Sequence, residues 1–274
     1  MRMKKFIPVN QKGGVGKTTT GYNFAHYAGE EGFRSALADG DEQANATKAM
    51  APYAIREFTT ADLFGSTPLP LPDRFDTLVL IPADKSRLRD VEQSALPDEQ
   101  LVANLRARLD ELAPHFDYMT FDTPGANSRI ANAFLAVSDF VLVPCKIDPF
   151  SVDVSTDVLL RIMYIQQNFN PGLVNFGIMA NEFDPRQPAQ VKELKELLAT
   201  YSQFMFPKYI TDRQAYREAA GAQVPVWRLK DAGDGDTRGR IKSAAREAGK
   251  EIRAVFQMLL QRMENTAGRV GEAA

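Results

Sequence analysis

Hydrophobic residues recur along the chain in short runs that are separated by segments of helix length. Short apolar runs predict buried strands, and the longer segments between them predict helices. Strands and helices that alternate in this way build parallel sheets whose right-handed crossovers cover both faces. The runs fall at residues 6–10, 35–39, 78–83, 118–122, 140–145, 174–180 and 205–210. We therefore expect an α/β fold with a doubly wound, mostly parallel sheet of about seven or eight strands and helices on both faces.

No internal repeat or low-complexity tract divides the chain, so we expect a single domain over residues 1–264. The segment from Asp231 to Gly239 holds three aspartates and three glycines. This composition predicts a loop, followed by a long helix from about Arg240 to Glu264. Residues 265–274 are predicted to form a flexible tail.

The composition limits which partners and sites the chain can have. It holds 33 basic and 35 acidic residues, a formal net charge of −2, so a polyanionic partner would need a local basic patch. One cysteine and two histidines exclude an internal disulfide and leave little for a zinc site. We expect no secretory signal and no membrane-spanning helix, because long uncharged apolar stretches are lacking. A cytoplasmic protein fits these features best.

A segment rich in glycine and lysine follows the first predicted strand, at residues 10–20. Its glycines let backbone N–H groups turn inward around an anion, and the next helix directs its positive end to the same place. Lys17 adds a full charge, and Thr18 can ligate Mg²⁺. The usual pattern GxxxxGK[ST] would need glycine where the chain has Gln11. The segment therefore predicts a phosphate-binding loop, formed by Lys12, Gly13, Gly14, Val15, Gly16, Lys17, Thr18 and Thr19.

Residues 12–19, Lys-Gly-Gly-Val-Gly-Lys-Thr-Thr, resemble the deviant Walker A phosphate loop of the ParA/MinD family of dimeric ATPases. The resemblance covers roughly residues 4–260. It implies the P-loop NTPase fold, ATP and Mg²⁺ as cofactors, and hydrolysis of ATP to ADP and phosphate with weak basal turnover. In that family the first lysine, here Lys12, reaches across a homodimer to the partner's phosphates. A cation delivered in this way acts only once two subunits meet, so turnover would be coupled to dimerisation.

Carboxylates end two of the predicted strands. Asp39 and Asp41 share one face of an extended segment, and Asp122 ends a strand further on. Carboxylates beside a phosphate loop can hold the water shell of Mg²⁺ and orient an attacking water. By resemblance Asp41 positions that water, Asp39 lies near Mg²⁺, and Asp122 is the Walker B acid. The predicted catalytic residues are thus Lys12, Lys17 and Asp41, and the predicted metal-site residues are Thr18, Asp39 and Asp122.

The chain departs from the family pattern at two positions. Glu42 replaces a proline, which alters the stiffness of the loop that carries Asp41. Gly125 replaces a second proline in the segment that would sense the terminal phosphate, so a looser switch is expected. Two further positions are predicted nucleotide contacts by resemblance: Asn181, which can meet the adenine edge, and Asp212, in the segment that closes the base pocket.

The C-terminal part is basic: 13 basic and 9 acidic residues follow Phe204. In the last predicted helix, basic residues form one row, which neutralises phosphates without reading bases. The alternative is a solvated face that Glu247 and Glu251 soften. Partition-type relatives bind nonspecific DNA through this region when they are dimerised by ATP, which favours DNA. The predicted DNA contacts are Arg238, Arg240, Lys242, Arg246, Lys250 and Arg253.

The resemblance is closest to short ParA-type partition ATPases that lack an N-terminal helix-turn-helix domain, because the phosphate loop begins near residue 1. It implies a nucleoid-associated ATP dimer that a centromere-bound ParB-type adaptor releases by stimulating hydrolysis, which segregates plasmid or chromosomal DNA. One alternative is a positioning ATPase for a cargo other than DNA, and another is a non-catalytic nucleotide switch. A MinD-like membrane protein is disfavoured, because Val270 is the only large apolar residue among residues 265–274. We therefore expect no stable membrane attachment.

Overall fold

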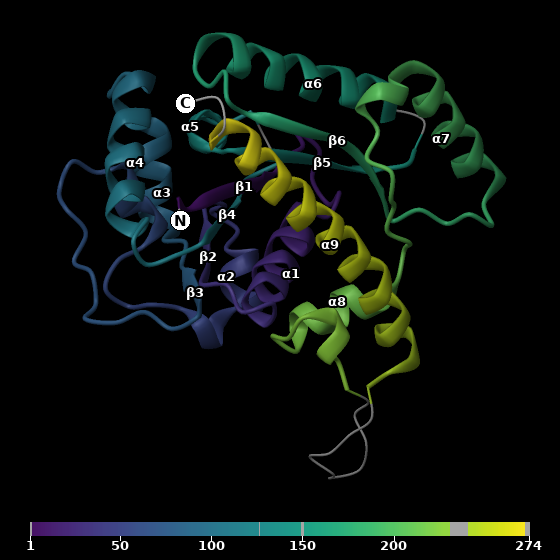
Figure 1. The fold of residues 1–274 in the computed structure, drawn as a ribbon, viewed down its shortest axis with the longest axis horizontal. Helices are drawn as coiled ribbons and strands as arrows, with labels where there is room; N and C mark the ends of the chain where they lie inside the picture. Colours follow the sequence, from purple (N-terminus) through teal and green to yellow (C-terminus); the bar gives the residue numbers. More distant parts are fainter. Residues whose placement is uncertain (1, 126, 149–150, 231–240, 272–274) are drawn as a thin grey trace.

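The chain folds around one sheet, as Figure 1 shows. The computed structural model describes residues 2–125, 127–148, 151–230 and 241–271. Within these ranges all the strands are parallel, in the order β3-β2-β4-β1-β5-β6. The strands are β1 (Lys4–Pro8), β2 (Ser35–Asp39), β3 (Leu78–Ile81), β4 (Tyr118–Asp122), β5 (Phe140–Lys146) and β6 (Val174–Asn181). The doubly wound α/β fold expected from the apolar pattern is confirmed.

The seventh apolar run, residues 205–210, is not a strand, so the predicted count of seven or eight is corrected to six over the described residues. The run does lie beside β6: the N–H groups of Phe206 and Ile210 donate to carbonyls of that strand, at 2.8 and 3.0 Å. The two donors are four residues apart, whereas their acceptors, Ile178 and Ala180, are only two apart on β6. The run therefore does not keep the regular register that a ladder needs.

Helices follow the strands, and α3 and α5 begin at side-chain caps. Asp84 accepts hydrogen bonds from the N–H groups of Ser86 and Arg87 at the start of α3, and Ser128 caps α5 in the same way. Such caps satisfy N–H groups that the helix itself leaves without a partner. The helices are α1 (Lys17–Glu30), α2 (Asn45–Ala49), α3 (Lys85–Gln93), α4 (Asp98–Leu112), α5 (Arg129–Val137), α6 (Ser151–Asn168), α7 (Pro188–Tyr201), α8 (Gln214–Gly221) and α9 (Ser243–Gly271).

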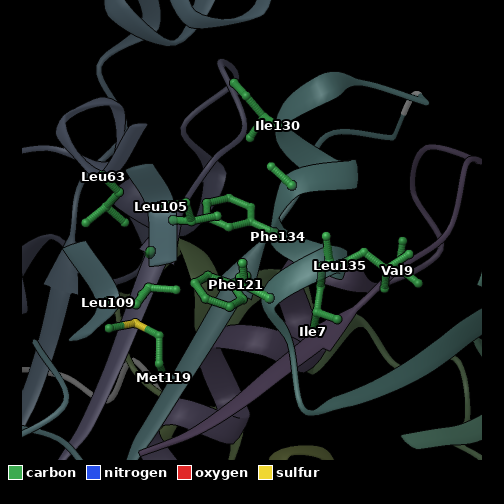
Figure 2. Close-up of a cluster of buried hydrophobic side chains, with 14 of the residues drawn as sticks. Ile7, Val9, Leu63, Leu105, Leu109, Met119, Phe121, Ile130, Phe134 and Leu135 are labelled. Carbon is green, nitrogen blue, oxygen red and sulfur yellow. The ribbon is translucent and has the colours of Figure 1, made fainter. Parts of the chain in front are cut away.

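One face of the sheet is covered by α3, α4, α5 and α6. Figure 2 shows the centre of this layer, where Phe121 of β4 and Phe134 of α5 stack with their ring centroids 4.4 Å apart. Leu105 and Leu109 of α4 are buried in the same cluster. Each fully buried side chain of this size contributes about 1.5–3 kcal/mol to stability.

The other face is covered by α1, α8 and α9, with α2 beside them. Phe24 of α1 lies between the sheet and the last helix: its ring centroid is 4.7 Å from that of Phe6 in β1 and 5.5 Å from that of Phe256 in α9. Helix α1, which follows the phosphate loop, is thus packed against the sheet on one side and against α9 on the other.

The last helix crosses the molecule diagonally from a start beside α8 (Figure 1). Near its far end, Glu264 accepts hydrogen bonds from Lys4 Nζ at 2.5 Å and from the Tyr118 hydroxyl at 2.6 Å. Helical backbone extends to Gly271, beyond the end predicted at Glu264, and it starts at Ser243 rather than at about Arg240. The flexibility of residues 265–274 and the domain boundary stay predictions. The loop predicted from Asp231 to Gly239 lies outside the described residues.

Strand order decides where chemistry can occur. All strands are parallel and β4 lies between β1 and β2, so the segments after these three strands meet at one edge of the sheet. Asp39 and Asp122 are register partners at the ends of β2 and β4. Ligands of doubly wound proteins bind outside this carboxyl edge. Within the described residues, no helix has the length and apolar character needed to cross a membrane.

Candidate active site

The predicted phosphate loop connects β1 to α1 and is anchored at its base. Asn10 Nδ2 donates to the carbonyl of Pro144 at 2.8 Å, and Asn10 Oδ1 accepts from the N–H of Lys12 at 2.9 Å. Gly14 and Gly16 have φ angles of 71° and 93°, in the left-handed region that glycine adopts without strain. Helix α1 begins directly after Gly16, so its positive end faces the loop. The arrangement is an anion-binding cradle.

Asn181, at the end of β6, holds this loop in place. Its Nδ2 donates to the carbonyl of Val15 at 2.8 Å. A Cβ at position 16 would lie only 2.1 Å from the same Nδ2, so Gly16 is required for the close approach. The predicted contact of Asn181 with adenine stays a prediction; in this structure its amide positions the loop.

The ammonium of Lys17 lies in a largely desolvated position. The residue is only 6% exposed, and its Nζ donates to the carbonyl of Lys12 at 3.2 Å. Burial lowers the pKa of Lys17, while the charges of Asp122 and Asp41 oppose that shift. A desolvated ammonium inside a cradle of N–H groups is suited to bind phosphate.

Asp122 is the most strongly perturbed acid of the site. Burial, and then the charge of Asp39, raise its pKa well above the usual value, and a hydrogen bond with the Thr18 side chain and the charge of Lys17 oppose this. Its Oδ1 accepts from the N–H of Thr123 at 3.1 Å, but its buried Oδ2 has no hydrogen-bond partner. A carboxylate oxygen left in this state beside a threonine hydroxyl fits the water shell of Mg²⁺.

Asp39 is used differently from its neighbour. Its Oδ2 accepts from both the N–H and the hydroxyl of Thr47 at 2.7 Å, and its Oδ1 accepts from the N–H of Asp41 at 3.1 Å. Burial raises the pKa of Asp39 to about 6. The carboxylate therefore fixes the turn that carries Asp41, and its predicted role near Mg²⁺ stays a prediction.

Asp41 faces the open cleft from that turn. It is half-buried, and its Oδ1 accepts from the N–H of Gln43 at 2.9 Å. The next residue, Glu42, forms an ion pair with Arg89 of α3 at 2.9 Å. A tether to α3 thus stands where the family has a proline, and because the pair is exposed it is a weaker constraint than a fixed φ angle.

The segment Thr123-Pro124-Gly125 lies directly on the phosphate loop. A Cβ at position 125 would meet the backbone of Gly13 at 3.3 Å and Lys17 Nζ at 3.4 Å. Glycine at this position therefore lets the segment touch the cradle with its backbone. A change at bound phosphates would directly alter the contacts of this segment, which is the property expected of a switch.

These elements enclose a cleft of about 970 Å³ at the carboxyl edge of the sheet. Lys12 does not line it: its ammonium is ion-paired with Asp148. Asp212 does not line it either, but it pairs at 3.8 Å with Arg217, which does. The lining residues include four that the sequence did not single out, Tyr22, Lys146, Glu182 and Arg217. Glu182 directly follows Asn181, so its place in the sequence was the available signal.

Comparisons with known proteins agree with this geometry. A family model described as an AAA domain matches residues 3–175. Protein IncC of Escherichia coli is 32% identical over 96% of this chain and 70% of its own length. The chain belongs to the ParA/MinD family. A second member, the chromosome partitioning protein ParA of Myxococcus xanthus, is 28% identical over 79% of this chain and 78% of its own length.

A solved ParA/MinD-type structure shows the same fold. A plasmid partition protein from Borrelia burgdorferi, bound to AMPPNP, superposes with a TM-score of 0.70 at 19% identity, over 96% of this chain and all of the other. The P-loop NTPase fold expected from the sequence is therefore confirmed.

As a ParA/MinD member the chain is an ATPase, with ATP and Mg²⁺ as cofactors. Its residues fit both. The cradle and Lys17 would hold the phosphates, and Thr18 and the orphaned oxygen of Asp122 would hold Mg²⁺ and its waters. No cluster of three or more metal-binding His, Cys, Asp or Glu side chains occurs in the described ranges. Mg²⁺ does not require such a cluster, because proteins bind it through one or two carboxylates together with nucleotide phosphates.

The predicted DNA contacts on α9 are less available than the ParA/MinD resemblance implied. Lys242 pairs with Glu218 at 2.7 Å, and Lys250 pairs with Glu247 at 2.9 Å. Arg253 lies over the rings of Tyr27 and Trp227, at 5.6 and 5.5 Å from their centroids. Arg246 is exposed and forms no ion pair with the described residues, whereas Arg238 and Arg240 lie outside them.

Proposed function

We propose that this chain is a partition ATPase whose ATP-bound form is a sandwich dimer. The observation that carries the proposal is the direction of Lys12, whose ammonium leaves its own cleft and pairs with Asp148. A lysine at the mouth of a phosphate site that does not serve this site is available for a second subunit. The relatives support the biological role, because the Myxococcus protein is named for chromosome partitioning and the Borrelia protein for plasmid partition.

Each charged residue then has a separate task in hydrolysis. Lys17 and the loop N–H groups neutralise the phosphates, and Asp41, which faces the cleft, orients the attacking water. Asp39 positions Asp41 through the turn. Lys12 of the partner subunit completes the charge compensation, so that turnover waits for dimerisation.

The dimer binds DNA without sequence preference, through basic residues around α9. Arg246 is the contact that we favour first, since it is not engaged elsewhere in the fold. Lys242 and Lys250 exchange their partially exposed ion pairs for phosphates at little cost, because such pairs contribute only about 0–1 kcal/mol. A centromere-bound ParB-type adaptor would stimulate hydrolysis and release the dimer from the nucleoid. The basic residues around α9 would thus act in a cytoplasmic, nucleoid-associated protein rather than in a membrane-bound one.

The proposal is tested by mobility shift on unrelated duplexes with no nucleotide, ADP or ATP, across a salt series and next to liposome co-sedimentation. Wild type should shift DNA only with ATP and lose affinity as salt rises. Asp41→Ala should stay on DNA longer, and Lys12→Ala should bind nucleotide but not turn it over. Binding to liposomes, or to DNA regardless of nucleotide, would contradict the proposal.

A further inference from the structure

A second hollow, of about 200 Å³, lies outside the nucleotide cleft, between α4, α5 and α6. Its apolar part comes from Leu101 of α4 and from Ile165 and Phe169 at the end of α6. Its polar part includes two arginines, Arg129 of α5 and Arg161 of α6, together with Asp98, Asn127 and Asn132. Helix α5 packs against both α4 and α6, so the hollow has a firm floor.

The two arginines are in different states. Arg129 is committed to the fold: its Nε donates to Asp98 at 2.7 Å and its terminal nitrogens donate to backbone carbonyls, among them that of Ser94 at 2.6 Å. Arg161 donates from Nε to Asn132 at 2.8 Å, but its Nη2 is buried without any hydrogen-bond partner. Among the described residues no carboxylate pairs with it, and burial lowers its pKa to about 10.

A guanidinium with an unpaired buried donor lowers the stability of the fold. Its presence therefore points to a role other than stability. A buried charge is normally paired, and an unpaired donor costs free energy that the fold does not recover. The acid that lines the hollow, Asp98, is already bonded to Arg129. An anion from outside the chain would supply the acceptor that Nη2 of Arg161 lacks.

Apolar side chains on the same helix point to the source of this anion. Tyr164 is 57% exposed and lines the hollow itself, next to Ile165 of the same helix. An apolar border adds nothing to the binding of a free ion such as phosphate. It does favour a protein partner, because hydrophobic contact around one desolvated charge pair is the usual make-up of a binding hot spot.

We propose that this hollow receives an aspartate or glutamate side chain of a partner protein, with Arg161 as the charged anchor and the apolar lining of the hollow, with the exposed ring of Tyr164, as the surrounding contact. The site does not depend on the proposed partition function. It does adjoin the switch: Asn127 and Arg129 line the hollow, and the segment 123–125 just before them lines the nucleotide cleft. A carboxylate bound to Arg161 would therefore lie close to the segment that contacts the phosphate loop.

The first test measures binding of two probe peptides to the full chain by NMR titration, acetyl-Leu-Glu-Leu-amide and its Glu→Gln counterpart. The glutamate peptide should bind wild type and bind Arg161→Gln at least about tenfold more weakly, which is about 1.4 kcal/mol. Arg74→Gln, which removes an exposed arginine elsewhere, should bind as wild type does. Equal binding of the two peptides, or inorganic phosphate binding as well as the glutamate peptide, would overturn the proposal.

The second measurement is thermal unfolding of the same variants without any probe. Arg161→Gln keeps a donor for Asn132 and removes the unpaired charge, so it should be at least as stable as wild type. If Arg161 only supports the fold, the variant melts at a lower temperature instead, and the proposal fails even where binding is reduced.

Discussion

The ammonium of Lys12 and the carboxylate of Asp148 form an ion pair across 136 positions of the sequence. Asp148 follows β5, which lies next to β1, so the pair closes over the base of the phosphate loop. Lys12 is thus restrained by its own chain. In the proposed dimer it would have to exchange this carboxylate for a phosphate of the second subunit.

Releasing Lys12 should make dimerisation easier. In Asp148→Asn the lysine no longer has to leave a charged partner, so the ATP concentration that gives half-maximal dimer should fall several-fold. Light scattering on a size-exclusion column measures this directly. Asp184→Asn is the matched control, since it breaks an exposed pair with Arg186 and should leave the dimer equilibrium unchanged. A higher ATP requirement in Asp148→Asn would show that Asp148 supports the dimer rather than restrains Lys12.

Substitution of the two buried acids, Asp122 and Asp39, should affect different properties of the enzyme. Asp122→Asn removes the carboxylate next to Thr18 and should weaken Mg²⁺-dependent ATP binding by about tenfold or more, which corresponds to roughly 1.4 kcal/mol. Asp39→Asn disturbs the bonds from Thr47 and should lower kcat while Mg²⁺-dependent affinity stays within a few-fold. Calorimetric titrations with and without Mg²⁺, next to steady-state turnover, separate the two. If Asp39→Asn loses the Mg²⁺ dependence, this residue is a metal-site residue after all.

His26 should make stability depend on pH. It is buried in α1 between Tyr22 and Tyr53, and burial lowers its pKa from 6.5 to about 4. Between these values the unfolded chain binds a proton that the folded chain does not, so the free energy of unfolding should fall as pH is lowered. The full loss is on the order of 3 kcal/mol.

The check on His26 compares urea unfolding of wild type, His26→Gln and His115→Gln between pH 4 and 7. His26→Gln should lose part of the pH dependence, and His115→Gln should keep it. The raised pKa of Asp39 acts in the opposite direction, with stability falling as pH rises toward about 6, and it is common to all three proteins. The difference between the curves therefore isolates His26. Parallel curves for all three would exclude a role for it.

The two arginines of the basic row should separate DNA binding from stability. Arg246→Ala removes an exposed charge, so DNA affinity should drop and the slope of log K against log salt should decrease by about one. Arg253→Ala removes a cation that lies over Tyr27 and Trp227, so its main effect should be a loss of about 0.5–2 kcal/mol of stability. Mobility shifts and chemical denaturation on both variants decide this. Unchanged DNA affinity in Arg246→Ala would place the DNA surface elsewhere.

The fold and the phosphate loop follow from local sequence, because period and spacing determine them. Six apolar runs became six parallel strands, and the glycines at 14 and 16 take the left-handed angles that the loop requires. The run at 205–210 is not a strand, because its two bonds to β6 are four residues apart on the run and two apart on the strand. Periodicity counts apolar residues and does not show whether a run keeps register with its neighbour.

Most partners of the charged residues did not follow from the sequence, because they come from distant segments. The pairing of Lys12 with Asp148 and the unpaired Nη2 of Arg161 depend on which elements pack together, and the bonds from Thr47 to Asp39 depend on how the intervening turn folds. Spacing placed Arg246, Lys250 and Arg253 on one helix, whereas Lys242 precedes α9. What the spacing lacked was the location of Tyr27 and Trp227 beneath Arg253.

The position of α9 has a consequence for biosynthesis. The helix is translated after all six strands, yet Phe256 covers Phe24 of α1, and Glu264 is bonded to Lys4 and Tyr118 near the start of the sheet. Until these residues leave the ribosome, the apolar face of α1 stays open to other chains, which favours aggregation and binding by chaperones. The layer of α3 to α6 can be assembled by then, since all of its helices precede α9. A stalled or truncated product would therefore carry a complete phosphate loop on a half-covered sheet.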